Sequence, residues 1–154
     1  IDTSVFDRTR AKNTLYEGGI RVPMIASGAG VTRINNREGA LINTVDIFAA
    51  ISEAAQIPEQ DYDHIDGVSF YPLLSDAAAS AREYNYSEFI SNDFSGWTVR
   101  NLDYKLIQTE EDGQELYYLP TDLDESDDLL LTGDNYQTIV DELADFAETI
   151  RGDE

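Results

Sequence analysis

The segment Lys12-Asn-Thr-Leu-Tyr-Glu-Gly-Gly-Ile-Arg-Val-Pro-Met-Ile, residues 12–25, contains the features from which we predict the fold. Two adjacent glycines, Gly18 and Gly19, follow Glu17. Glycine adopts positive φ more readily than other residues, so we expect positive φ at one of them. The run 20–27 is short, apolar and bordered by glycine, which predicts a buried strand. The segment should therefore form a loop that exposes Lys12, a glycine turn and a strand, with Pro23 at a strand start, edge or bulge.

The composition excludes several classes of protein. The chain has 154 residues, enough to bury a core, and a net charge of −21 from 31 acidic and 10 basic residues. This charge argues against nucleic acid or an anionic membrane as a partner. The chain has no cysteine, which excludes a disulfide, a cysteine metal site and a cysteine nucleophile. No run is long and apolar enough to predict a membrane span, and no signal peptide is visible at Ile1.

The charge is distributed unevenly along the chain. Residues 1–37 contain six basic and three acidic residues, a balance of +3, whereas the remainder contains four basic and 28 acidic residues, a balance of −24. The basic region surrounds Lys12, as expected if this region faces an anion. Clustering of arginines in a loop is the alternative, and we assign Arg33 and Arg37 to a solvated loop.

The first half of the chain predicts one helix and irregular structure. A helix is expected at about 43–56, with Ile47, Ile51 and Ala54 on its buried side. Asp46 lies in the first turn, where a carboxylate stabilises the helix dipole. Residues 57–83 are irregular, and His64 is interpreted as a surface loop residue. The run 61–72 lacks the ligand spacing of an EF-hand, so we predict no calcium site there.

The second half predicts four strands and a long helix. Strands are expected at 84–90, 96–100, 104–109 and 114–119, and the pair Asp112-Gly113 predicts a hairpin between the last two. A final helix is expected at about 134–151, begun by a capping box of Asp134 and Gln137. Its predicted buried stripe consists of Ile139, Leu143, Phe146 and Ile150, helped by Val140 and Ala147.

Two motifs in this order resemble a known family. Residues 12–23 resemble the second signature region of the sulfatase family, within the alkaline-phosphatase-like superfamily, whose members hydrolyse sulfate esters. Residues 66–74, Asp-Gly-Val-Ser-Phe-Tyr-Pro-Leu-Leu, are similar to a later segment of that family. The pattern from Val99 to Tyr117 resembles its small C-terminal subdomain. The resemblance covers residues 12–150 and implies the C-terminal part of a sulfatase only.

The resemblance also implies a fold between α/β and α+β. Residues 1–80 would be the end of the catalytic α/β domain, a strand plus a helix. Residues 81–154 would form a small α+β subdomain of about four antiparallel strands packed on one long helix.

The resemblance places Lys12 in the active site, in contact with the sulfate group. A lysine ammonium is a compact point charge that suits a non-planar oxyanion. Arg10 is expected to bind substrate, and Glu17 to pair with Arg21 or nearby amides. We assign no metal ligand in this chain. A calcium ion and a formylglycine nucleophile are expected in the parent protein, which the resemblance suggests is periplasmic or secreted.

Different functions remain open at this point. The chain is either the C-terminal fragment of a sulfatase, inactive alone, or a non-catalytic binding or interaction module. A phosphate or phosphonate monoester hydrolase of the same superfamily is a further alternative. Unpaired strand edges at 20–26 and an uncovered Ile47 and Ile51 face also predict a homo-oligomer, with residues 1–75 either poorly ordered or buried in its contact.

Overall fold

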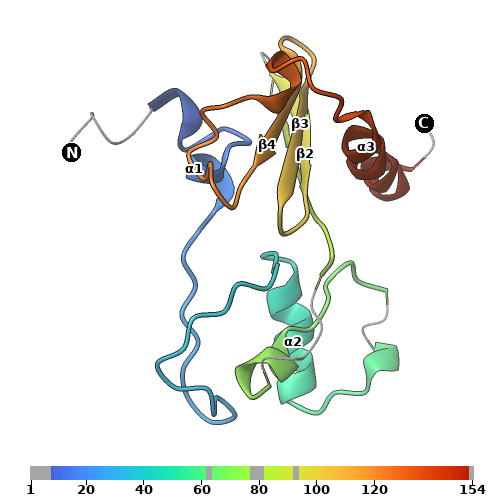
Figure 1. The fold of residues 1–154 in the computed structure, drawn as a ribbon. Coiled ribbons are helices and arrows are strands. Elements are labelled where there is room, and N and C mark those ends of the chain that lie inside the picture. Colours follow the sequence, from blue (N-terminus) through green and yellow to red (C-terminus); the bar gives the residue numbers. More distant parts are fainter. Residues whose placement is uncertain (1–7, 62–63, 77–81, 92–93, 153–154) are drawn as a thin grey trace. The chain divides into compact units, whose positions relative to one another are not determined.

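The computed structural model describes residues 8–61, 64–76, 82–91 and 94–152. Contacts divide the chain into two compact units, one formed by Ile1–Pro23 with Tyr86–Glu154 and the other by Met24–Asn85 (Figure 1). Residues 12–23 of the Lys12 segment therefore group with the sheet, whereas Met24 and Ile25 belong to the unit that contains the helix near residue 50. A domain boundary at residue 80 and a homo-oligomer both stay predictions.

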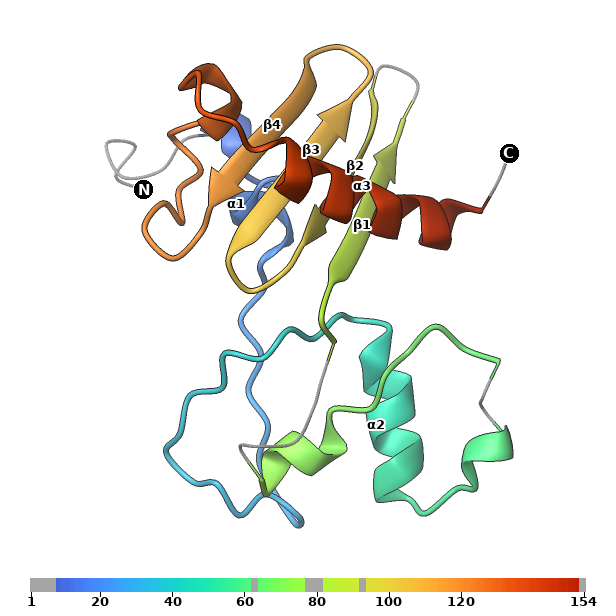
Figure 2. The ribbon, with the colours of Figure 1, turned by 45° about the vertical axis from the view of Figure 1, so that its right-hand side comes forward.

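The first unit is built on a four-stranded antiparallel sheet in the order β1-β2-β3-β4 (Figure 2). The strands are β1 Asn85–Ile90, β2 Ser95–Arg100, β3 Tyr104–Thr109 and β4 Gly113–Tyr118. These strands confirm the four predicted from the sequence. Gly113 has φ 82° and ends the tight turn between β3 and β4, as the Asp112-Gly113 pair predicted.

One face of the sheet packs against helix α3, Gln137–Arg151. Because side chains alternate along a strand, the paired residues Val99, Leu106 and Leu116 all point to this face, and all three are buried. The helix buries Val140, Leu143 and Ala147. The predicted buried side was right at Leu143 and at the flanking Val140 and Ala147. It was wrong at Ile150, which is exposed, because the packed face does not reach the last turn of α3.

The predicted capping box of α3 is also wrong. The helix begins at Gln137, and its N-cap residue, Tyr136, makes no side-chain cap hydrogen bond. The side chain of Asn135 accepts a hydrogen bond from the Gln137 N–H at 3.1 Å, in the way that Asn side chains cap turns. Asp134 therefore lies outside the helix.

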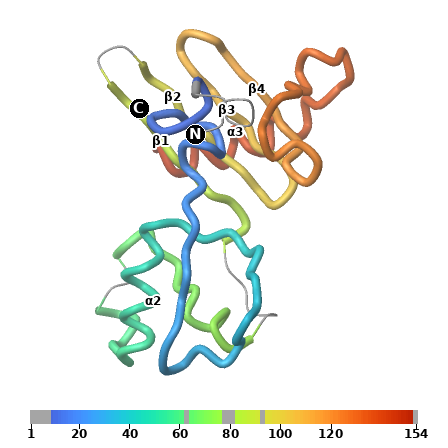
Figure 3. Tube along the Cα trace, turned by 90° about the vertical axis from the view of Figure 1, so that its left-hand side faces the viewer, coloured from blue at the N-terminus to red at the C-terminus, as the bar shows by residue number. Residues whose placement is uncertain are grey.

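The other face of the sheet is covered by the Lys12 segment, with the short helices η1 Arg8–Arg10 and α1 Glu17–Ile20 (Figure 3). Leu15 is buried in a core cluster with Ile107, Tyr117 and Leu119. Gly96 of β2 leaves room for it, since a Cβ there would lie 3.1 Å from Leu15 Cδ1. The segment is thus an integral layer of this unit.

Residues 20–27 do not form the predicted strand. Residues 17–20 form α1, and residues 21–27 have no regular structure and are exposed; Ile25 is 92% exposed. A strand needs a neighbour to pair with its N–H and C=O groups. Within the described ranges, no strand pairs with this segment.

The second unit contains helix α2, Asp46–Ala54, which confirms the predicted helix with narrower bounds. Its predicted buried side is wrong: Ala49, Ala50 and Ser52 are buried, whereas Ile51 is 64% exposed. Ala50 packs with Phe70 and Leu73, the latter in the short helix η3, Tyr71–Leu74. The sequence motif at residues 66–74 therefore provides the core of this unit.

Asp46 has the structural role that was expected of it and two further partners. Its carboxylate accepts hydrogen bonds from the N–H groups of Asn43 and Val68 at 2.7 and 2.8 Å. It also accepts the Arg82 Nε–H at 2.8 and 2.9 Å. One buried carboxylate thus connects α2, the 66–74 motif and the chain that leads to β1.

Candidate functional site

Lys12 lies in an exposed loop between η1 and α1. Among the residues that the structure describes, no ion pair involves Lys12. The turn after it is made by Asn13, which has φ 70°, and Thr14 Oγ1 donates to the Ala11 carbonyl at 2.6 Å. The chain has one other lysine, Lys105, whose exposed fraction is 0%. Lys12 is therefore the solvent-exposed lysine of this chain.

Gly18 and Gly19 are required for close packing and not for positive φ. Neither has positive φ, so that prediction is wrong. A Cβ on Gly18 would collide with the Arg10 carbonyl oxygen, and one on Gly19 with the Thr14 carbonyl oxygen. The two glycines let α1 lie directly against the loop that carries Lys12.

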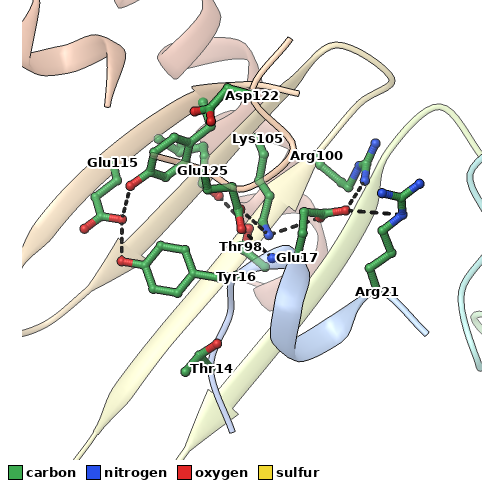
Figure 4. A network of polar contacts seen from close by, with 12 residues as sticks. Thr14, Tyr16, Glu17, Arg21, Thr98, Arg100, Lys105, Glu115, Asp122 and Glu125 are labelled. Atoms are coloured by element: carbon green, nitrogen blue, oxygen red, sulfur yellow. Dashed lines mark hydrogen bonds and ion pairs between the residues drawn. The ribbon is translucent and has the colours of Figure 1, made fainter. Parts of the chain in front are cut away.

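Glu17, the first residue of α1, is buried and is held by cations from two strands (Figure 4). Its carboxylate accepts hydrogen bonds from Arg100 Nη1 at 2.8 Å and from Lys105 Nζ at 3.1 Å. The predicted partner Arg21 lies farther away, with Nε 4.0 Å from Glu17 Oε2, and is mostly exposed. The prediction that Glu17 is structural is confirmed, but its principal partners are remote in sequence.

Glu125 completes the buried cluster. Its Oε1 forms an ion pair with Lys105 Nζ at 2.7 Å, and its Oε2 accepts the backbone N–H of Glu17. Burial raises the pKa of Glu125, and the Lys105 ammonium beside it opposes that rise. Two carboxylates thus balance two cations under α1. We call these four residues the buried ion cluster: Glu17, Arg100, Lys105 and Glu125.

Arg10 lies over two aromatic rings. Its guanidinium carbon is 4.8 Å from the centroid of the Tyr16 ring and 5.7 Å from that of Tyr117. Both tyrosine hydroxyls donate to Glu115 Oε2, at 2.7 and 2.8 Å. Burial raises the pKa of both tyrosines, and the hydrogen bond to Glu115 raises it further. Arg10 itself is half-buried against these rings. Its substrate-binding role stays a prediction.

The described residues do not offer a metal site. Within those ranges, no group of three or more His, Asp or Glu residues is placed to hold a metal ion. Residues 62–63 of the rejected EF-hand segment lie outside the described ranges, and His64 is exposed. Among the residues that the structure describes, no helix is long and apolar enough to span a membrane. The calcium ion expected in the parent protein stays a prediction.

Sequence reasoning missed three members of the buried ion cluster. A weak signal was present at Lys105, because alternation places it on the same face of the strand as the apolar Ile107. No sequence pattern linked it to its partners. Glu17 is 88 positions away in the sequence, and Glu125 lies in the loop after β4.

The sequence matches a known protein family over almost its whole length. The profile of the family described as "N-sulphoglucosamine sulphohydrolase, C-terminal" matches residues 4–152. The chain belongs to this sulfatase family. This result confirms the predicted family and the predicted C-terminal position.

Curated relatives of this sulfatase C-terminal region are much longer than the chain. A sulfatase of Formosa agariphila is 30% identical over 143 residues, which cover 83% of this chain and 26% of the relative. The uncharacterized sulfatase YdeN of Escherichia coli is 28% identical, with 77% of this chain and 27% of the relative covered. The chain thus spans about a quarter of the length of these relatives.

Solved structures of sulfatases have the same fold in this region. A candidate sulfatase from Bacteroides thetaiotaomicron matches with a TM-score of 0.75 and 24% identity, over 88% of this chain and 30% of that one. A 2-O GAG sulfatase matches with a TM-score of 0.65 and 25% identity, over 80% and 28%. A third protein, solved with its substrate D-glucosamine-2-N,6-O-disulfate, has a TM-score of 0.56 and 21% identity, over 69% and 23%. These likenesses confirm the predicted sheet and C-terminal helix.

Proposed function

We propose that this chain is the C-terminal part of a sulfate ester hydrolase and that Lys12 binds the sulfate group. One observation carries the proposal: an exposed lysine without an ion pair among the described residues is followed within five residues by two buried anchors. Leu15 is buried in the core of the sheet, and Glu17 is buried in an ion cluster. A loop with only a linking role would not need such anchors so close to a cation.

The chemistry of a sulfate ester suits an ammonium group at this position. The sulfate group carries negative charge on oxygens that are arranged as a tetrahedron, and charge grows on the bridging oxygen as the ester bond breaks. A positioned cation stabilises that charge without a costly rearrangement. We therefore assign Lys12 to the sulfate oxygens. Arg10 is proposed to add positive potential to the same anion, with its guanidinium held over Tyr16 and Tyr117.

The remaining groups of the proposed reaction belong to other parts of the protein. The chain has no cysteine that could become formylglycine, and the described residues offer no metal site. We therefore propose that the chain alone does not hydrolyse sulfate esters, and we derive no step through the nucleophile or the metal.

Steady-state kinetics of the longer protein with an aryl sulfate test the proposal. Lys12→Ala is expected to lower kcat/KM by about 100-fold or more, as removal of one positioned charge-stabilising group does in other enzymes. The control is Arg151→Ala, which removes an exposed cation from α3, on the opposite face of the sheet. Full activity of Lys12→Ala would overturn the assignment.

The same assay separates the other functions. Hydrolysis of a phosphate or phosphonate monoester in preference to the sulfate would support the related hydrolase. Tight binding of a sulfated sugar without turnover of any ester would support a binding module. Either result would reject the sulfatase proposal.

A further inference from the structure

We infer that Lys105 and Glu125 are positioning residues for Lys12. The effect that these two residues have on activity rests on the proposed function. Both residues are buried, and they contact Glu17 and each other. They act through Glu17, the residue at which α1 begins. The inference assigns a role to a buried lysine and a buried glutamate that the sulfatase proposal alone does not use.

Glu17 is attached to its surroundings at three atoms. Its backbone N–H donates to Glu125, its Oε1 accepts from Lys105, and its Oε2 accepts from Arg100. These partners come from β2, from β3 and from the loop after β4. Three directional bonds from three elements fix both the place and the orientation of the first turn of α1.

Only a short, restrained path separates Glu17 from Lys12. Within residues 11–17, Lys12 and Asn13 are exposed, whereas Ala11, Leu15 and Glu17 are buried. Tyr16 is held through its hydroxyl by Glu115 of β4. With α1 fixed, the backbone of the loop has little freedom, and the position of Lys12 follows from the position of Glu17.

The loop after β4 is itself built to direct Glu125 at α1. Glu125 has φ 55°, a left-handed backbone conformation that is uncommon for a residue other than glycine. The turn is held by Asp122, whose carboxylate accepts the N–H groups of Ser126 and Asp127 at 2.9 and 3.0 Å. A strained residue held by its neighbours is typical of a position with a specific task.

Net stability does not account for the charges in this cluster. Apolar side chains of similar volume often replace a buried ion pair without loss of stability, and sometimes with a gain. What such side chains do not provide is direction, because apolar contacts are not oriented. The cluster is therefore suited to fixing α1 in one orientation.

The first experiment needs no catalysis and uses the 154-residue chain. Hydrogen exchange of residues 12–21 is compared with that of β2 to β4 in Glu125→Gln, and in Lys105→Met combined with Glu125→Gln. The double variant leaves Glu17 paired with Arg100 and no unpaired buried charge. Leu143→Ala is the control, because Leu143 is buried against the other face of the sheet.

We expect the cluster variants to speed exchange in residues 12–21 by about tenfold or more while the strands keep their protection. Leu143→Ala should instead speed exchange throughout the sheet and α3. Equal acceleration in the segment and the strands by the cluster variants would overturn the inference, because the cluster would then be a general stabilising element.

The second experiment is a double-mutant cycle in the longer protein. Glu125→Gln is expected to lower kcat by about tenfold when Lys12 is present, and to cost nothing further in a Lys12→Ala background. Equal losses in both backgrounds would contradict positioning through Lys12. If Lys12→Ala alone left activity unchanged, the proposed function would fail, and the exchange experiment would still decide whether the cluster fixes the segment.

Discussion

Gly18 and Gly19 lie so close to the preceding backbone that neither position has room for a methyl group. Both glycines are needed because any side chain at these positions would collide with the backbone. A larger residue would push α1 away from the Lys12 loop and pull Glu17 from its partners.

We predict that Gly19→Ala lowers the free energy of unfolding by about 1–3 kcal/mol, the usual cost of overpacking. The measurement is urea unfolding followed by circular dichroism. The matched control is Gly39→Ala, since a Cβ on Gly39 would meet nothing within 4 Å and its φ is not positive. Equal stability of Gly19→Ala and the wild type would contradict the packing argument.

Tyr16 and Tyr117 make stability depend on pH in the alkaline range. Burial, with the hydrogen bond to Glu115, raises both pKa values in the folded state above the ordinary value of about 10. The folded state therefore keeps these protons when the unfolded state has lost them. The stabilising effect is fully present below pH of about 10 and is lost as the pH rises toward the folded-state pKa values.

We predict that the urea midpoint of the chain falls steadily above pH of about 10. Tyr16→Phe should make this fall shallower, because one of the two coupled hydroxyls is gone. Tyrosinate absorbance measured alongside checks the cause: the last tyrosines should ionise only as the chain unfolds. Complete ionisation in a still folded chain would show that the two hydroxyls are not protected.

At the scale of elements, strands and helices with a clear period were predictable, and elements that need a partner were not. The alternation in residues 84–119 and the Asp112-Gly113 pair predicted β1 to β4 with nearly correct bounds. The run 20–27 has strand composition, but composition does not provide a pairing strand. The buried side of α2 was displaced because tertiary contacts selected the small residues Ala49 and Ala50, whereas the predicted side of α3 was wrong at Ile150, which is exposed.

The candidate site was also predictable only in part, because some of its residues depend on contacts between distant segments. Lys12 could be singled out because a contiguous motif surrounds it. Lys105 and Glu125 could not, because the contact that gives each its role joins segments far apart in the chain. Gly18 and Gly19 were recognised as important, but whether glycine serves a turn or a close approach depends on the neighbouring backbone.

Helix α2 allows a prediction about an element as a whole. Asp46 is buried, and its carboxylate holds the helix start, the N–H of Val68 and the side chain of Arg82. Asp46→Ala would leave Arg82 and two N–H groups without this partner. Breaking such a buried pair costs about 3–5 kcal/mol.

We therefore expect Asp46→Ala to abolish hydrogen-exchange protection in α2 while β2 to β4 keep theirs, since they belong to the other unit. The control is Glu59→Ala, which removes an exposed carboxylate from the same unit. Retained protection in α2 of the Asp46→Ala chain would show that Asp46 is not the link that we describe.

At the scale of the whole molecule, the dominant property is charge. A net charge of −21 on 154 residues repels itself, and one of the two lysines is buried and balances carboxylates inside the fold. Self-repulsion of this kind destabilises a compact state, and salt screens it. The buried ion cluster is shielded from salt, so screening acts on the surface charges.

We predict that raising sodium chloride from about 0.05 M to about 1 M increases the Tm of the chain by several degrees, because the Debye length falls from well over 10 Å to about 3 Å. Potassium chloride at the same ionic strength is the control and should give the same rise, because screening depends on ionic strength. A Tm that is constant or falls with salt would contradict the dominance of surface repulsion.

We propose that Lys12 of this sulfatase C-terminal region contacts the sulfate group of the substrate. The test measures the rate at which an amine-reactive acetylating reagent modifies Lys12 in the longer protein. Mass spectrometry of the peptide that contains Lys12 follows the reaction, with and without a saturating sulfate ester. Lys105 is fully buried and provides an internal reference within the same digest. We predict that the sulfate ester slows acetylation of Lys12 by about tenfold or more, whereas an equal concentration of the desulfated alcohol does not. Acetylation of Lys12 at the same rate with and without the sulfate ester would contradict the account.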